Sequence, residues 1–222
     1  MKRNSKVSTA VIRRLPRYYR QLTELQEAGV VRISSSALGK SMGLTASQIR
    51  QDLFCFGGFG QQGYGYKVDS LREEIGEILG ISKGHTLVVV GGGNLGRTLI
   101  RNFKFKKYGF QLLAAFDVNE QVVGSEIAGV PVFHINELEE FLAQNSVDVG
   151  LLTVPSGVAQ EMGDRLIDAG VKGIWNFTNY EISSSREDVV IESVHFSDSL
   201  LTLSYMISQQ DDQELVEAEE EP

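Results

Sequence analysis

The sequence has very little cysteine and no segment long and apolar enough to cross a membrane. Its only cysteine, Cys55, cannot form an intramolecular disulfide or a zinc site, so we interpret it as a small buried hydrophobe. No apolar run approaches the roughly 20 residues of a membrane span. The basic N-terminus also lacks the apolar core and cleavage site of a secretory signal. These absences predict a cytoplasmic protein with no metal centre and no membrane partner.

Basic charge is scarce except at the front of the chain. Residues 1–60 carry ten Lys or Arg and three Asp or Glu, whereas residues 61–210 carry eleven and nineteen. A basic segment joined to an acidic body is typical of a polyanion-binding module, because Lys and Arg displace counterions from phosphate. Residues 211–222 carry seven acidic residues, no basic residue and no aromatic residue, so we expect a disordered tail.

The basic segment begins with a helical pattern. Apolar residues recur every three or four positions over 8–28, which predicts a helix that Gly29 ends. Pro16 lies inside the pattern, so this helix either kinks at Pro16 or begins near it.

Two shorter helices are predicted next, in the order of a helix-turn-helix. The first fits Ser35–Met42. Thr45 and Gln48 then have the spacing of a capping box, in which each side chain bonds the other residue's backbone N–H. The helix that this box opens runs through Phe54.

A glycine-rich segment follows the third helix. Five glycines and four aromatics are interleaved over 56–66, which predicts the β-ribbon of a wing. Ser70 and Glu73 have the spacing of another capping box, for a helix that stops at Gly80. The pattern therefore predicts a winged helix-turn-helix domain over residues 1–82.

From residue 83 the pattern changes to short apolar strands separated by helical stretches. The strands are TLVVVG, QLLAAFD, VPVF, VDVGLLTVP and GIWNF. Strands that alternate with helices form parallel βαβ units, with helices on both faces of the sheet. The sequence thus predicts an α/β chain whose second domain, residues 83–196, is a doubly wound Rossmann sheet.

A glycine motif opens the first of these units. Gly91, Gly93 and Gly96 form a G-x-G-x-x-G pattern between a strand and a helix, which permits a tight turn and the close approach of a pyrophosphate. Asp117 ends the next strand, where a carboxylate can accept hydrogen bonds from a ribose diol. Because a carboxylate repels a 2′-phosphate, we expect NAD(H) rather than NADP(H). A purely structural turn, or another nucleotide-like ligand, is the alternative.

Two further strand ends belong to the carboxyl edge of the same sheet, where open α/β sheets bind ligands. We expect Thr153, Pro155 and Asn176 to contact the cofactor, and Phe177 to be either core or pocket wall. With the glycine turn, the candidate cofactor-binding residues are Gly91, Gly92, Gly93, Asn94, Leu95, Gly96, Asp117, Thr153, Val154, Pro155, Asn176 and Phe177.

Little of the chain remains to build an enzyme. A dehydrogenase needs a proton donor at the hydride site and a second domain or long loops to hold its substrate. The histidines are better explained as surface or structural residues than as such a donor; they are His85, His134 and His195. After the last strand there is one amphipathic helix, residues 197–210, whose apolar face we expect to pack on a symmetry-related subunit.

To about residue 210, the chain resembles the Rex family of redox-sensing repressors. The segments that carry the resemblance are RRLPRYYRQL, TASQIRQDLFCFGGFGQQGYGY, VVVGGGNLGR, LLTVP and GIWNF. The resemblance implies a winged helix followed by a Rossmann domain, in a homodimer whose C-terminal helix swaps onto the partner. It also implies a repressor without catalytic turnover, which releases a pseudo-palindromic double-stranded operator when NADH replaces NAD+.

Ser47, Arg50 and Gln51 resemble the major-groove face of the family. Their spacing of i, i+3 and i+4 independently places them on one side of a helix, opposite Ile49 and Leu53. The full set of candidate DNA-binding residues is Arg14, Thr45, Ser47, Gln48, Arg50, Gln51, Gly60, Gln61, Gln62, Gly63 and Tyr64.

Other positions bear on the switch that the family implies. Arg20 matches an arginine of interdomain and intersubunit contacts, whereas its expected partner His195 stands at a position often acidic in relatives. Gln61 and Gln62 replace basic wing residues, which weakens the attraction of phosphate. Phe103 stands where relatives often have a tyrosine near the nicotinamide, so we include Phe103 among the cofactor-binding residues. Phenylalanine lacks the tyrosine hydroxyl that could report the redox state. We therefore expect the contacts of the switch to differ here.

Two other functions stay open. One is a small NAD-dependent oxidoreductase fused to a DNA-binding module. The other is a metabolite sensor that binds coenzyme A or another adenosine ligand in the same crevice. Substrate-dependent NADH oxidation would indicate the first, and competition titrations would reveal the second.

Overall fold

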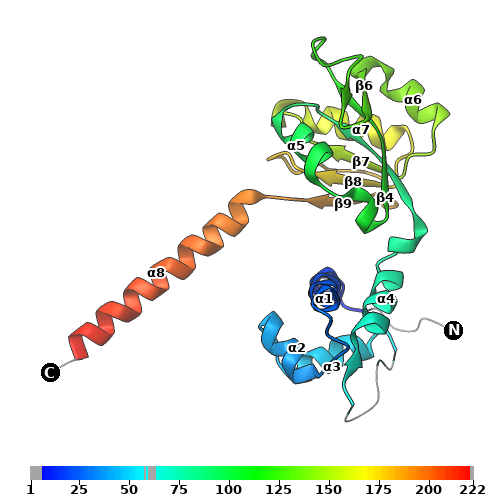
Figure 1. Cartoon of the computed structure of the whole chain (residues 1–222). Helices are drawn as coiled ribbons and strands as arrows, with labels where there is room; N and C mark the ends of the chain where they lie inside the picture. Colours follow the sequence, from blue (N-terminus) through cyan, green and yellow to red (C-terminus); the bar gives the residue numbers. More distant parts are fainter. Residues whose placement is uncertain (1–6, 58, 60–63, 221–222) are drawn as a thin grey trace. The chain divides into compact units, whose positions relative to one another are not determined.

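The computed structural model describes residues 7–57, 59 and 64–220, and the chain divides into two compact units, Met1–Gly84 and His85–Pro222 (Figure 1). The division falls two residues beyond the 82/83 limit that the sequence suggests. Gly80 and Gly84 have φ angles of 76° and 70°, so the backbone turns twice between the last helix of the first unit and the first strand of the second.

The first unit is a small helical domain with a two-stranded ribbon. Its elements are α1 (Thr9–Glu27), β1 (Arg32–Ile33), α2 (Ser35–Met42), α3 (Ala46–Phe54), β2 (Tyr66–Lys67) and α4 (Val68–Ile78). The two strands pair antiparallel, with Ile33 opposite Tyr66. This arrangement gives the helix-turn-helix and the base of the predicted wing. Residues 58 and 60–63 of the wing lie outside the described part of the chain.

One apolar cluster holds the helices of the first unit together. Leu15, Tyr18 and Leu22 of α1 pack in it with Ile49 and Leu53 of α3, and all five side chains are buried. Their spacing of three, four and seven residues places each set on one face of its helix. The inward face of α3 is therefore fixed, and its opposite face is left for other contacts.

Pro16 lies inside α1 without ending it. The helix begins at Thr9, and the Ser8 side chain caps it by accepting a hydrogen bond from the Val11 N–H. Pro16 is exposed, so the backbone carbonyl that loses its helical partner there can bond to water. The expectation of a helix start near Pro16 is therefore wrong.

Two of the predicted caps differ from the structure. The Thr45 hydroxyl accepts from the Gln48 N–H at 3.1 Å, but between these two described residues the return bond from the Gln48 side chain is absent. The helix expected at Ser70 begins at Val68. The reason lies in the tertiary structure, because the Val68 N–H donates to the Val31 carbonyl at 3.1 Å and strand β2 passes directly into α4.

The second unit is built on a seven-stranded sheet. Its strands are β3 (His85–Val90), β4 (Phe110–Asp117), β5 (Glu126–Ile127), β6 (Val130–His134), β7 (Val149–Leu152), β8 (Gly173–Asn176) and β9 (Val190–Ser193). The order is β5-β6-β4-β3-β7-β8-β9, and every pair is parallel except β5 with β6. The chain winds outward in both directions from β3, which places the topological switch point between β3 and β7.

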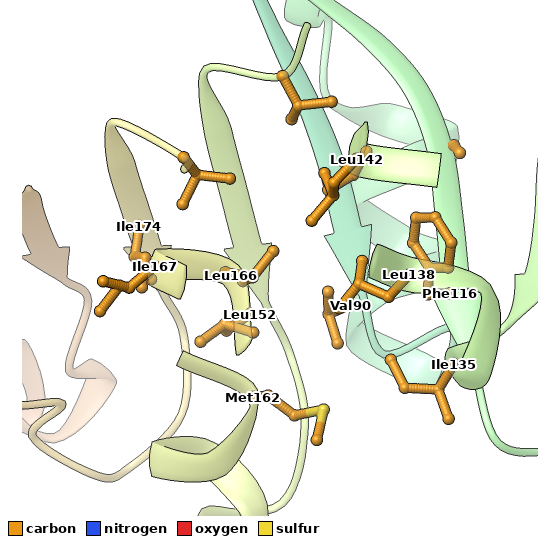
Figure 2. Packing of buried hydrophobic residues seen from close by; sticks show 14 of the residues in the cluster. Val90, Phe116, Ile135, Leu138, Leu142, Leu152, Met162, Leu166, Ile167 and Ile174 are labelled. Carbon is orange, nitrogen blue, oxygen red and sulfur yellow. The ribbon is translucent and has the colours of Figure 1, made fainter. Parts of the chain in front are cut away.

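Helices cover both faces of this sheet, as the sequence predicts. They are α5 (Asn94–Asn102), α6 (Leu138–Gln144) and α7 (Ala159–Asp168). Val88 and Val90 of β3 belong to the core with α6 and α7, and Figure 2 shows Val90 near Leu138. Leu87 and Val89 belong to a second core, with α5. Alternate residues of one strand thus enter two cores, which confirms the doubly wound fold.

The chain ends in the long helix α8 (Phe196–Glu220), where the sequence suggests a shorter helix and a disordered tail. The helix continues because Gln, Glu, Leu and Ala in the tail are good helix formers. Every residue from Phe196 to Gln210 is exposed, including several large apolar side chains. No helix in the described part of the chain is long and apolar enough to cross a membrane.

Candidate functional site

The turn after β3 has room for a ligand on one side only. Gly91 has a φ of 106°, and a Cβ there would lie 2.8 Å from the Thr153 carbonyl oxygen. A Cβ on Gly96 would overlap the Gly91 carbonyl oxygen, so α5 packs on the turn only with glycine at that position. A Cβ on Gly93 would meet nothing within 4 Å. The turn is therefore open where the sequence predicts the pyrophosphate. The next predicted residues are the exposed Asn94 and the half-buried Leu95.

Asp117, at the end of β4, is bonded to this turn. One carboxylate oxygen accepts from the Gly92 N–H at 2.5 Å, and the other accepts from the Asn119 N–H at 2.7 Å. Each oxygen keeps a further lone pair for a ligand hydroxyl. From the first turn of α5, the Arg97 side chain donates through Nε to the Gly92 carbonyl at 3.1 Å. The structure thus brings the predicted ribose acceptor and the glycine turn together.

Thr153 connects the next strand end to the same turn. Its hydroxyl donates to the Gly91 carbonyl at 2.7 Å, across the switch point between β7 and β3. Val154 is half-buried and Pro155 is exposed. Thr153 therefore holds the turn in place, and the two residues after it lie at the carboxyl edge of the sheet.

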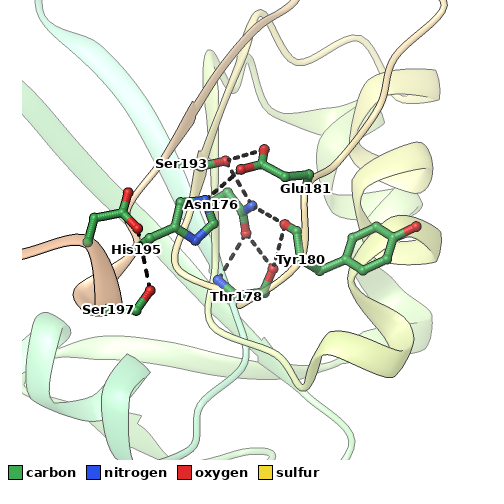
Figure 3. Close-up of polar contacts among 8 residues, drawn as sticks. Asn176, Thr178, Tyr180, Glu181, Ser193, His195 and Ser197 are labelled. Carbon is green, nitrogen blue, oxygen red and sulfur yellow. Dashed lines mark hydrogen bonds and ion pairs between the residues drawn. The ribbon is translucent and has the colours of Figure 1, made fainter. Parts of the chain in front are cut away.

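Asn176, at the end of β8, has a different environment from the one expected of a cofactor contact. It is fully buried, and its amide nitrogen donates to the Tyr180 carbonyl at 2.7 Å and to the Ser193 hydroxyl at 3.1 Å (Figure 3). Its amide oxygen accepts from the backbone N–H and the hydroxyl of Thr178. Because all its bonding positions are occupied, Asn176 shapes the loop after β8 and ties it to β9.

The predicted switch residue His195 is paired within its own unit. His195 directly precedes α8, and its Nε2 lies 2.6 Å from Oε1 of Glu181 (Figure 3). Arg20, its predicted partner, is an exposed residue of α1 in the other unit, so the Arg20–His195 contact stays a prediction. Among the described residues, no group of three or more His, Cys, Asp or Glu could hold a metal ion.

Phe103 lies in an aromatic group at the far end of α5 from the glycine turn. Its ring is stacked on Tyr108 at 5.3 Å and meets Trp175 edge-on at 5.5 Å. Trp175 in turn contacts Phe177, whose ring lies 6.3 Å from that of Phe196, the first residue of α8. The nine residues of α5 span about 13 Å, so Phe103 and Gly93 are not brought together.

The three residues predicted to face the major groove are placed as expected on α3. Ser47, Arg50 and Gln51 are exposed, while Ile49 on the opposite side is buried. Arg50 also donates to the Ser35 hydroxyl at 3.1 Å, which links the two helices of the motif. These three side chains are therefore polar, one of them is basic, and all are free of core contacts.

Cys55, the C-cap of α3, is exposed, so the expectation of a buried thiol is wrong. It stands two residues after the buried Leu53, on a different side of the chain, and its thiol contacts the Gln51 carbonyl at 3.3 Å.

Arg14, which stays a predicted DNA contact, forms an ion pair with Asp52 on the inward side of α3. Its Nε and Nη2 each lie 2.7 Å from a carboxylate oxygen of Asp52, a residue only 2% exposed. The Tyr18 hydroxyl donates to the same carboxylate at 2.9 Å. The pKa of Tyr18 is raised well above its usual value, mainly by burial and next by its hydrogen bond to Asp52. The hydrogen bond to Asp52 also raises the pKa of Arg14. Both groups keep their protons, and the pair fixes α3 on α1.

The remaining candidate DNA contacts lie at the start of α3 and in the wing. Thr45 is exposed at the N-cap, and Gln48 is half-buried one turn later. Tyr64 is exposed, and its carbonyl accepts from Arg32 at 3.1 Å. The other wing candidates lie outside the described residues; they are Gly60, Gln61, Gln62 and Gly63.

Sequence reasoning missed two residues that organise these sites. Asp52 shares the inward side of α3 with Ile49 and Leu53, and a carboxylate there requires a buried partner. That position was the available signal, because Arg14 occurs on the largely apolar side of α1. Glu181 gave no comparable signal, since nothing local connects it to His195.

Comparisons with known proteins agree with this division of the chain. A family model described as a CoA binding domain matches residues 82–180, and one described as a putative DNA-binding protein N-terminus matches residues 6–53. The chain is similar to the redox-sensing transcriptional repressor Rex of Caldicellulosiruptor saccharolyticus, with 49% identity over 94% of this chain and 95% of that protein. The Clostridium tetani protein of the same name is 48% identical, over 96% of this chain and 100% of that protein.

Solved structures of RSP, a Rex-family repressor, are similar to this chain over nearly all of its length. The complex of RSP with β-NAD+ and operator DNA has a TM-score of 0.86 and 45% identity, and covers 98% of this chain and 100% of RSP. The complex with β-NADH has a TM-score of 0.88 and 43% identity, over 96% and 100%. The relatives are named as repressors rather than enzymes, which disfavours the oxidoreductase alternative. The chain therefore belongs to the Rex family of redox-sensing transcriptional repressors.

Proposed function

We propose that this chain is a transcriptional repressor that binds double-stranded operator DNA through its first unit and NAD(H) through its second. It leaves the operator when NADH replaces NAD+. One observation carries the proposal: a single chain holds both an exposed polar face on α3 and a glycine turn bonded to Asp117. The complexes of RSP with operator DNA, β-NAD+ and β-NADH support the same pairing of ligands.

The residues at the carboxyl edge of the second unit fit a dinucleotide. The open side of Gly93 and the N-terminus of α5 would hold the pyrophosphate, and Asp117 would accept the ribose hydroxyls. The nicotinamide, when bound, supplies a ring whose charge differs between its two redox states. Val154, Pro155 and the ring of Phe177 are our candidates for the walls around it.

The first unit has the charge and geometry for a major groove. Ser47, Arg50 and Gln51 would contact base edges, while Thr45 at the N-cap would hold a backbone phosphate. Arg14 would act indirectly, because its guanidinium is bonded to Asp52 beneath the helix.

Coupling between the two ligands requires an assembly with two arrangements. We infer that α8 joins two copies of the chain, since its exposed side chains include Leu200, Leu201 and Met206. DNA would bind the arrangement whose recognition helices lie about 34–36 Å apart, and NADH would favour the other. Arg20 and His195 are our candidates for the contacts that differ between them. A coupling of about 1–3 kcal/mol is enough for such a response.

The description of the family model that matches the second unit also supports the coenzyme A alternative. Coenzyme A and NAD(H) share the adenosine and pyrophosphate that the turn would hold, so the nicotinamide is what distinguishes them. Competition of coenzyme A against NADH measures that preference directly. A repressor acts where the DNA is, so the proposal also places the chain in the cytoplasm.

The deciding experiment measures binding to an operator duplex at one fixed salt concentration, without nucleotide and with NAD+ or NADH. We expect NADH to weaken DNA binding at least fivefold relative to NAD+, in keeping with the coupling above. Equal affinity with both nucleotides contradicts redox sensing, and the absence of sequence-specific DNA binding contradicts the repressor assignment.

A further inference from the structure

Phe54, the last residue of α3, is exposed to an unusual degree. The residue is 80% exposed, more than any other large apolar residue in the described part of the chain. Its neighbour Leu53 is buried in the core of the first unit, so the helix is firmly seated while the phenyl ring stands in solvent. Among the described residues of the first unit, no core cluster and no ring contact includes Phe54.

The ring lies on the same side of α3 as the residues assigned to the major groove. Ser47, Arg50, Gln51 and Phe54 follow the spacing i, i+3, i+4 and i+7, which is one face of a helix. With a rise of 1.5 Å per residue, Phe54 lies about 10 Å along the axis from Ser47. This distance corresponds to about three base pairs of B-DNA at 3.4 Å each.

Duplex DNA is the occupant that the charge of this face favours. The first 60 residues carry ten basic and three acidic residues, and Arg50 stands one turn before the ring. A polyanion such as DNA is therefore attracted to this face. The acidic second unit of another copy would also complement the basic charge. It would not explain why Phe54 shares one helix face with Ser47 and Gln51. The major groove presents one apolar group on its base edges, the C5-methyl group of thymine.

We propose that Phe54 is a specificity-determining residue that packs on the C5-methyl group of a thymine in the major groove. The inference rests on the proposed DNA binding. It adds to that binding a preference for thymine over uracil, which polar contacts cannot supply because the two bases differ only in the methyl group. Burial of one methyl group predicts an effect of about fourfold on affinity, by the usual value of about 0.8 kcal/mol per buried carbon.

The experiment pairs a protein variant with a DNA variant. The duplex that the wild-type chain binds best is selected from a random library, and each thymine is then replaced singly by uracil, which removes only the C5-methyl group. For the wild type, we expect one replacement to weaken binding about fourfold. Phe54→Ala should bind the thymine duplex about fourfold more weakly and be indifferent to that replacement, while Phe54→Leu keeps part of the preference.

The matched control is Ile12→Ala, which removes an exposed apolar side chain of α1 in the same unit. It should keep the wild-type ratio of thymine to uracil affinity. The proposal is overturned if the wild type and Phe54→Ala have equal ratios of thymine to uracil affinity at every position. It is also overturned if Phe54→Ala loses the dimer while this ratio is unchanged. If the selection yields no preferred duplex, the proposed DNA binding fails, which is a different result.

Discussion

Asp117 gives the sharpest test of the nucleotide site at the scale of one residue. Replacing it with Ala removes the acceptor for the ribose and should weaken NADH binding about 10- to 100-fold, the equivalent of one strong charge-assisted hydrogen bond. DNA binding without nucleotide should stay within about twofold of the wild type. The measurements are a fluorescence titration with NADH and operator binding by anisotropy.

The control is Asp188→Ala, which removes a carboxylate of the same unit that pairs with Arg186 at the surface. It should leave NADH affinity unchanged. Unchanged affinity in Asp117→Ala would show that the adenosine lies elsewhere.

The second and third glycines of the motif should respond differently to alanine. Gly93 has a φ of −69° and open space beside it, so Gly93→Ala should fold like the wild type but bind NADH at least tenfold more weakly. Gly96→Ala forces a methyl group onto the Gly91 carbonyl and should lower the thermal unfolding temperature of the protein. If Gly93→Ala binds NADH like the wild type, the pyrophosphate does not approach there.

At the scale of elements, the buried ion pair between Arg14 and Asp52 fixes the packing of α3 on α1. Asp52→Ala leaves the Arg14 guanidinium without its partner in a mostly buried position, and we expect the unfolding free energy to fall by about 3 kcal/mol. Tyr18→Phe removes only one hydroxyl and should cost about 1.5 kcal/mol. Urea titrations measure both. A wild-type unfolding midpoint for Asp52→Ala would mean that the pair does not hold the helix.

A second ion pair ties together the amino ends of three neighbouring strands. Asp148, before β7, bonds Lys172 before β8 at 2.6 Å and also accepts from the Thr86 N–H of β3 at 3.2 Å. The bond to Lys172 is the main cause that lowers the pKa of Asp148. Because its pKa is lower in the folded state, the stabilisation is fully present above about pH 4 and is lost as the pH falls through the folded value.

Asp148→Asn should therefore be less stable than the wild type at pH 7, by about 1 kcal/mol. The difference should shrink in urea titrations below about pH 4, where the wild-type carboxylate becomes protonated. A difference that stays constant down to pH 3 would contradict the assigned pKa shift.

The sequence predicted the elements whose cause is local. The period of apolar residues defines α1, the capping residue Thr45 marks the start of α3, and the strand, glycine turn and helix of the second unit need only neighbouring residues. It could not predict β9, four residues at the sheet edge with partly exposed side chains. Nor could it predict the saturated bonds of Asn176, which depend on Ser193 and on the loop after β8.

At the scale of the whole molecule, α8 should hold two copies together. Deleting residues 197–222 should abolish the dimer and the response to NADH, because burying each apolar side chain such as Leu200 or Leu203 is worth roughly 1.5–3 kcal/mol. Deleting only 211–222 removes acidic residues and should change little. Sedimentation and NADH-dependent operator binding of both truncations are the measurements. A stable, NADH-responsive dimer without residues 197–222 would place the interface elsewhere.

The apolar surface of α8 also has a consequence for temperature. Association by apolar burial is driven by entropy near room temperature and weakens on cooling. A repressor that needs two recognition helices on one operator then loses occupancy in the cold through dissociation of its subunits. With α8 as the interface, the controlled genes would be expressed at low temperature even when the nicotinamide pool is fully oxidised.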